Sequence, residues 1–194
     1  CIRALRSFPY DQVKNYLYEA LLHKDVHVGI ASSEIILETL PEDQWIDVSS
    51  LINGMTHWRI VANLYEAALK AGRNKDLAKE IQQRYTRAAD PYERAWLLGA
   101  LKHYPPAIDF VKEQLVDADT AVVRSAGACA IATMTPVDGL TLAQKSRFAQ
   151  IYREAMRSQD DPAVLGIIAS ALADSTLNFR AIIKDPSFLY DAKR

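Results

Sequence analysis

Residues that end helices recur along this chain at nearly equal intervals, and this recurrence restricts its possible folds more than any other feature. Each closes a run of helix-forming or apolar residues, and neighbouring ends stand about 32 residues apart, too far for one ordinary helix. The helix ends are Pro9, Pro41, Gly72, Pro105 and Pro136. Junction residues divide the chain again at Asp25, His57, Asp90, Asp119 and Asp161. The sequence therefore predicts a repeating unit of two helices.

The clearest copy of a helix from this unit lies at residues 89–105, ADPYERAWLLGALKHYP. Asp90 is a favourable N-cap, and Pro91 suits the first helical position because a helix leaves that N–H unpaired in any case. Glu93 follows three residues after Asp90, which predicts a capping box. Pro105 then ends the run. Both ends of this helix are therefore specified locally.

Apolar residues elsewhere recur at helical spacing, and no stretch shows the sustained alternation of a strand. The longer predicted helices cover residues 9–23, 26–40, 57–71, 75–88, 106–116, 119–134, 141–156 and 163–173. Shorter helices are expected within 42–55 and 177–183, and another helix start at Asp185. Thr141 and Gln144 predict a second capping box. We therefore expect an all-α chain.

A pair of helices of this length cannot bury its own apolar face, so the pairs are expected to stack into a solenoid of about five units. Residues 1–194 would then form a single helical-repeat domain. Residues 4–9 share their pattern with residues 100–105, so the chain opens inside a repeat. We expect it to be a fragment of a longer protein.

Small residues stand at one fixed position in each unit, ten residues before a helix end or soon after a junction. They are Ala31, Ala62, Ala95, Ala126 and Gly166. A small residue allows two helices to cross closely, and a larger side chain there would cost about 1–3 kcal/mol through overpacking. We therefore expect these positions to be buried at helix crossings.

The composition excludes several classes of protein. A net charge of -1 gives no general attraction for nucleic acid or anionic membranes. No stretch approaches about 18 consecutive apolar residues, so no membrane span is expected. Cys1 and Cys129 cannot form a disulfide scaffold, and Cys129 is expected to be a small core residue. We expect a soluble chain, compatible with either the cytoplasm or the periplasm.

The stretch 119–126, DTAVVRSA, resembles the Asp…Val-Arg…Ala signature of the second helix in HEAT-like repeats. Asp90-Pro91 and Asp161-Pro162 match the junction part of that signature. The resemblance implies an armadillo-like, right-handed α-solenoid whose second helices line the binding face. The short period is closer to tetratricopeptide repeats, but their Trp, Gly and Tyr pattern is not found. A non-repeating helical domain is the remaining alternative.

Residues 90–101 also resemble helical repeats that accompany cyclophilin-type peptidyl-prolyl isomerase domains in some bacterial proteins. No cyclophilin-like catalytic stretch is present. The resemblance implies that any such activity would belong to another part of the parent protein.

No motif for nucleophilic, phosphate-binding or metal-dependent chemistry occurs in the sequence. His23 and His27 flank a predicted helix junction and should not share a helix face, and the acidic pairs fit solvated helix faces. We therefore predict no catalytic residue, no cofactor and no metal site.

The remaining candidates are residues of the second helices that could contact a partner. They are Arg59, Asn63, Tyr92, Arg94 and Arg124. Arg124 has a structural alternative, hydrogen bonding to carbonyl groups or to an Asp of the adjacent unit. Trp58 and Trp96 fit either a core position or an interface hot spot.

These observations predict a non-catalytic scaffold or protein-interaction segment whose partner is another protein or a neighbouring domain of the same chain. The first alternative is an enzyme acting on nucleic acid, because some DNA glycosylases have a HEAT-like fold, although the neutral charge makes a nucleic-acid partner the weaker hypothesis. An accessory domain of a peptidyl-prolyl isomerase, and a spacer or dimerisation unit, are the others.

Overall fold

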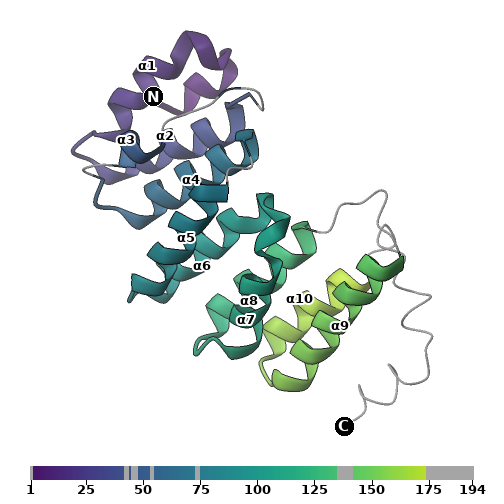
Figure 1. The fold of residues 1–194 in the computed structure, drawn as a ribbon. Helices are drawn as coiled ribbons and strands as arrows, with labels where there is room; N and C mark the ends of the chain where they lie inside the picture. The colour runs from purple at the N-terminus through teal and green to yellow at the C-terminus, as the bar shows by residue number, and fades with distance from the viewer. Residues whose placement is uncertain are drawn as a thin grey trace. The chain divides into compact units, whose positions relative to one another are not determined.

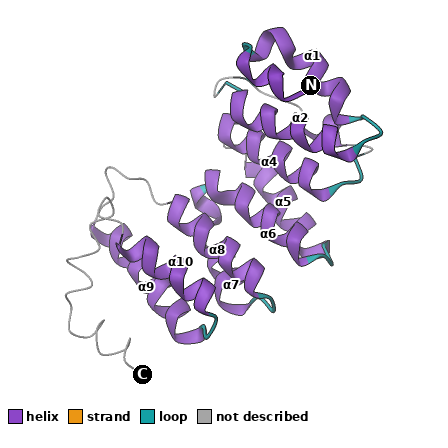
Figure 2. Ribbon diagram, turned by 180° about the vertical axis from the view of Figure 1, so that it is seen from behind, coloured by secondary structure: helices purple, strands orange, loops and turns teal. Residues whose placement is uncertain are grey.

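The computed structural model describes residues 2–41, 44, 48–52, 55–72, 75–134 and 142–173, and these residues form helices and connecting loops with no strand among them (Figures 1 and 2). The predicted all-α class is therefore confirmed. The chain divides into two compact units, Cys1–Tyr104 and Pro105–Arg194. The division falls at Pro105, one of the predicted helix ends. The sequence predicts one helical-repeat domain, and the two units of the structure are described separately below.

The N-terminal unit consists of helix pairs in which the second helix of each pair packs on the second helix of the next. Its elements are η1 (Ile2–Ser7), α1 (Tyr10–Leu21), α2 (Val26–Thr39), α3 (Val48–Ile52), α4 (Trp58–Gly72), α5 (Lys75–Arg87), α6 (Pro91–Ala100) and η2 (Leu101–His103). Helix α1 packs against α2, α2 against α4, α4 against α6, and α5 against α6. The helices α2, α4 and α6 therefore form a continuous row (Figure 1).

The C-terminal unit repeats this arrangement. Its elements are η3 (Pro105–Ala107), α7 (Ile108–Asp117), α8 (Ala121–Met134), α9 (Leu142–Ser158) and α10 (Pro162–Ala173). Helix α7 packs against α8 and α9, and α10 packs against both α8 and α9. Thr141, the predicted helix at 177–183 and the predicted start at Asp185 lie outside the described residues. None of the helices in the described part of the chain has the length and apolar character needed to cross a membrane.

Side-chain caps begin several of these helices, as the junction residues predict. Asp25 accepts a hydrogen bond from the His27 backbone N–H at 2.9 Å. Asp90 and Asp161 make the same bond at α6 and α10, each at 2.8 Å. His57 takes this place at α4, where its Nδ1 accepts from the backbone N–H two residues later at 3.3 Å. Each cap satisfies one N–H that the first helical turn leaves unpaired.

The capping box predicted for α6 does not form. Asp90 provides its half, but the Glu93 carboxylate accepts from Arg84 Nε of α5 at 2.9 Å. An ion pair with a neighbouring helix has replaced the local bond to the cap backbone. The local pattern thus identifies the helix start correctly and the role of Glu93 wrongly.

The expected crossing positions are buried in the N-terminal unit and are not fully buried in the C-terminal unit. Ala31, Ala62 and Ala95 have 7%, 1% and 8% of their surface exposed. Ala126 is only half-buried, and Gly166 is exposed, with no atom within 4 Å of the place that a Cβ would take. These two expectations are therefore corrected.

The close approaches in the structure are made by glycines that the fixed position did not identify. A Cβ on Gly127 would lie 3.2 Å from Cα and Cβ of Leu115 on α7. A Cβ on Gly29 would lie 2.8 Å from Cδ1 of Ile60 and 3.0 Å from the carbonyl oxygen of Leu21. The close approach of α8 to α7 is thus made one residue beyond Ala126. Neighbouring positions on a helix face directions about 100° apart, so Ala126 and Gly127 lie on different sides of α8.

Cys129 is exposed, which corrects the expectation that it is a core residue. The buried side of α8 is formed by Val123, Gly127, Ala128, Ala130, Ile131 and Met134. Small residues occur on both sides of this helix, so the run SAGACAIA by itself did not indicate which face is buried.

Helix α4 is the centre of the N-terminal unit, because every residue from 60 to 69 is buried. Two of these residues are polar and need partners inside the protein. Asn63 Nδ2 donates to Ser33 Oγ of α2 at 2.9 Å. The Glu66 carboxylate lies 2.6 Å from Lys102 Nζ and 3.4 Å from His103 Nε2. Burial would raise the pKa of Glu66, but the hydrogen bonds and charges of His103 and Lys102 outweigh it and lower the pKa below its ordinary value of 4.5.

Replacing Gly29 with alanine should destabilise the protein by about 1 kcal/mol, because the overpacking against Ile60 and the Leu21 carbonyl exceeds the gain in helix propensity. Gly99→Ala is the matched control, since no atom lies within 4 Å of the place that its Cβ would take. That change should stabilise by about 0.5–1 kcal/mol. Urea denaturation measures both changes in the free energy of unfolding. Changes of the same sign and size in the two variants would contradict the close approach at Gly29.

Replacing Glu66 with glutamine should destabilise the protein by about 1–3 kcal/mol at neutral pH, because Lys102 and His103 lose a buried acceptor charge. A carboxyl whose pKa is lowered on folding stabilises above its unfolded pKa and loses this contribution as the pH falls. The free energies of unfolding of the wild type and of Glu66→Gln should therefore become more similar below about pH 4.5. Chemical denaturation from pH 7 to 3 measures this difference, with Glu19→Gln, at an exposed glutamate outside this contact, as the control variant.

Candidate partner-binding site

A hollow of about 380 Å³ lies on the N-terminal unit, along the first turns of α2 and α4. Its walls include Arg3 of η1, His27 and Glu34 of α2, and Trp58 and Arg59 of α4. The row of second helices brings these residues together from distant parts of the sequence. We refer to this hollow as the α2–α4 groove.

Arg59 connects three helices at the edge of the groove. Its Nη2 lies 2.6 Å from Oε1 of Glu34 on α2. Its guanidinium carbon lies 4.8 Å from the ring centroid of Trp96 on α6, the geometry of a cation–π contact. Arg59 and Glu34 keep 37% and 27% of their side-chain surface exposed. Solvent therefore weakens the ion pair, and both side chains remain accessible to a partner.

Two tryptophans adjoin the same arginine. The rings of Trp58 and Trp96 lie 6.2 Å apart and are tilted by 49°, and His57 stacks on Trp58 at 5.4 Å. Both tryptophans are half-buried, so each is neither a full core residue nor a fully exposed one. Part of each ring supports the helix contact and part faces solvent.

The aromatic surface continues along α6. Tyr92 keeps 58% of its surface exposed. It stands one helical turn before Trp96, and residues four apart lie on the same side of a helix. Tyr92 thus extends the aromatic surface toward the start of α6.

The groove has mixed charge. Arg3 and Arg59 are cationic, Glu34 is anionic and already paired, and apolar Ile30 and Ala31 lie among them. Such a surface differs from the continuous basic groove that a nucleic acid requires. Across the part of the chain that the structure describes, no group of three or more His, Cys, Asp or Glu side chains could hold a metal ion.

Of the five residues predicted to bind a partner, Arg59 alone lines the groove. Tyr92 is exposed and Arg94 is half-buried, and both lie on α6. Asn63 is only 1% exposed, which corrects its assignment to the surface. Because α4 packs against both α2 and α6, only the ends of α4 remain accessible, and Asn63 lies inside the buried stretch.

Arg124 belongs to the C-terminal unit, where its side chain makes a hydrogen bond to a backbone carbonyl group, as the structural interpretation of this residue predicted. Its Nη1 donates to the carbonyl oxygen of Ala118, the C-cap of α7, at 2.9 Å. The side chain thus satisfies one of the carbonyl groups that a helix end leaves unpaired. This contact joins α8 to the end of the preceding helix, α7.

Sequence reasoning missed His27 and Glu34 as site residues. Glu34 follows Ala31 by three residues, and Arg59 precedes Ala62 by three. Glu34 and Arg59 thus carry opposite charges three residues from the alanines expected at the helix crossings, and this pattern could have predicted their ion pair.

Comparison of the chain with protein-family models, curated proteins and solved structures found no match.

The contact between Arg59 and Trp96 should contribute about 0.5–1 kcal/mol in a double-mutant cycle of Arg59→Met and Trp96→Leu. The exposed pair Asp11–Lys14, 3.5 Å apart, is a suitable comparison and should show a coupling of at most a few tenths of a kcal/mol. Chemical denaturation of the single and double variants gives both energies. Zero coupling between Arg59 and Trp96 would contradict the observed geometry.

Proposed function

We propose that this chain is a segment of a right-handed, HEAT-like α-solenoid. In this proposal it binds a protein partner and has no catalytic activity of its own. The binding face consists of the α2–α4 groove with Trp58, Trp96 and Tyr92. The observation that supports this most is the half-exposed cluster of two tryptophans and Arg59 beside a groove of mixed charge.

The chemistry of this cluster suits protein recognition. Tryptophan, tyrosine and arginine are the residues most enriched among interface hot spots, because they bury much area with little loss of conformational freedom. Arg59 and the two rings are already held by one another and by Glu34. A partner would therefore meet side chains that need little further ordering.

The mixed charge of the groove favours a protein over a nucleic acid as partner. The carboxylate in the groove, Glu34, is engaged by Arg59, so it is not poised as a general acid or base. An isomerase activity of the parent protein would lie outside this segment.

A displayed library of random peptides, selected against the whole chain, tests this proposal. Selected peptides should bind the wild type and lose about tenfold or more in affinity toward Trp96→Ala, as expected for a hot-spot residue. Gln83→Ala, on the exposed side of α5, is the matched control and should bind as the wild type does.

Peptides that bind Trp96→Ala and the wild type equally would overturn the proposed face. Recovery of no peptide, together with tight binding of a single-stranded oligonucleotide, would favour the enzyme hypothesis instead. Circular dichroism of each variant establishes that the helical fold is intact.

A further inference from the structure

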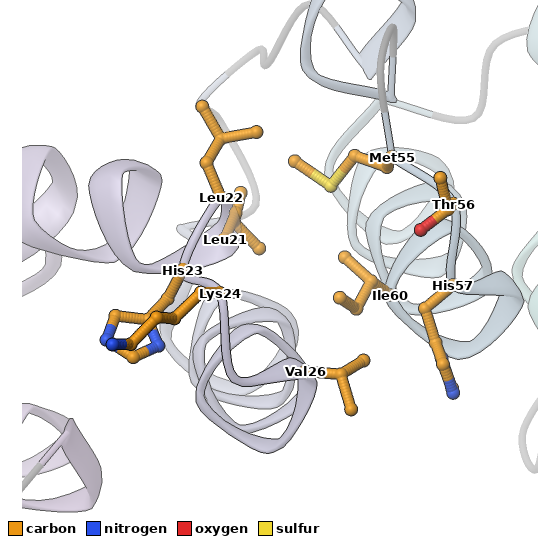
Figure 3. A pocket seen from close by; sticks show the side chains of 9 residues that line it. All are labelled: Leu21, Leu22, His23, Lys24, Val26, Met55, Thr56, His57 and Ile60. Atoms are coloured by element: carbon orange, nitrogen blue, oxygen red, sulfur yellow. The ribbon is translucent and has the colours of Figure 1, made fainter.

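A second hollow, of about 180 Å³, adjoins the α2–α4 groove at His57, which lines both. It lies between the α1–α2 turn and the residues that lead into α4. Leu21, Leu22, Val26, Met55 and Ile60 line it with apolar side chains, whereas His23 and Lys24 lie together at one edge (Figure 3). We refer to this hollow as the Leu22 pocket.

The pocket is built on the close approach at Gly29. Ile60, which is 4% exposed, fills the space beside Gly29 and forms the inner wall. Leu22 and Val26 form the outer rim and are 70% and 37% exposed, and large apolar side chains exposed around one hollow are typical of an interaction site. The inner wall is thus fixed by packing, while the rim remains uncovered.

The size of the pocket limits what it can hold. Small-molecule sites usually measure about 300–1,000 Å³, so a hollow of this volume suits one apolar side chain better than a whole ligand. An extended peptide can place a single anchor there while its neighbouring residues lie along the rim and the adjoining groove.

The charges around the pocket define the flanks of such a peptide. Lys24 at the rim and Arg3 in the adjoining groove have no ion-pair partner among the described residues. Among the described carboxylates near the two hollows, Glu34 is paired with Arg59, and Asp25 keeps its charge at the start of α2, which it caps. The cationic side chains of Lys24 and Arg3 can therefore attract an acidic partner.

We infer that the Leu22 pocket receives one apolar side chain of an acidic, extended peptide segment of a partner protein. The leucine-sized anchor contacts Leu22, Val26 and Met55, and the acidic neighbours face Lys24 and Arg3. This inference rests on the proposed function and adds the chemical class of the partner to it.

Fluorescence anisotropy with a labelled peptide, one leucine flanked on both sides by glutamates, tests the inference against the full chain. Replacing the leucine with serine, or the glutamates with lysines, should each weaken binding about tenfold or more, since the anchor loses its apolar burial or the flanks become repulsive. Binding of the acidic peptide should also weaken at high salt.

Variants of the protein complete the test. Leu22→Ser and Lys24→Glu change exposed side chains, so the fold is retained, and each should reduce binding of the acidic leucine peptide about tenfold. Lys24→Glu should in turn gain affinity for the peptide with lysine flanks. Tyr16→Ser, which alters an equally exposed apolar residue that lines neither hollow, should bind as the wild type does.

Three results would overturn the inference: no binding of the acidic leucine peptide, equal binding of the peptide with lysine flanks, or self-association of the chain through Leu22 seen by sedimentation, which would make a second copy the occupant. The variant Trp96→Ala separates the two proposals. If binding of library-selected peptides requires Trp96 but not Leu22, the proposed function stands and the pocket assignment fails. If binding of the acidic peptide requires Leu22 but not Trp96, the pocket assignment stands and the proposed binding face fails.

Discussion

The N-terminal unit depends on the burial of α4. A run of ten residues, from 60 to 69, loses its contact with solvent because α2 and α6 both pack on this helix. A helix usually buries one stripe, and burial on all sides requires neighbours on all sides. The helix pairs of this unit therefore cannot be stable separately, since α4 completes the core of the pairs before and after it.

Polar residues within this run fix the rotation and the axial position of α4 relative to the neighbouring helices. Apolar burial stabilises without specifying direction, so a smooth apolar helix could rotate or slide against its neighbours. Asn63 pairs with Ser33 of α2, and Glu66 pairs with Lys102 of η2. Each contact is lost if α4 shifts by one residue. The same seating places Arg59 and Trp58 at the accessible end of the helix, where they meet Glu34 and Trp96.

The sequence was sufficient to predict the longer helices among the described residues, because caps and helix ends are local features. It located Ala31, Ala62 and Ala95 in buried positions, but it placed the close approach of α7 and α8 at Ala126 and missed Gly127. Within a run of small residues, moving one position along a helix changes the face by about 100°, and only the neighbouring helix decides which face is buried. The site was harder to predict for the same reason, since Glu34, Arg59 and Trp96 are brought together by packing between α2, α4 and α6.

The three-helix contact of Arg59 has a consequence for how this surface can diversify during evolution. One guanidinium contacts both Glu34 and Trp96, so a substitution at this position disturbs partners on two other helices. A change of specificity at the centre of the proposed binding face therefore requires coordinated changes at three distant codons. Leu22 and Lys24 lie on an exposed turn and are free of this constraint. Lineages should therefore vary the rim first and keep the centre of the face unchanged for longer.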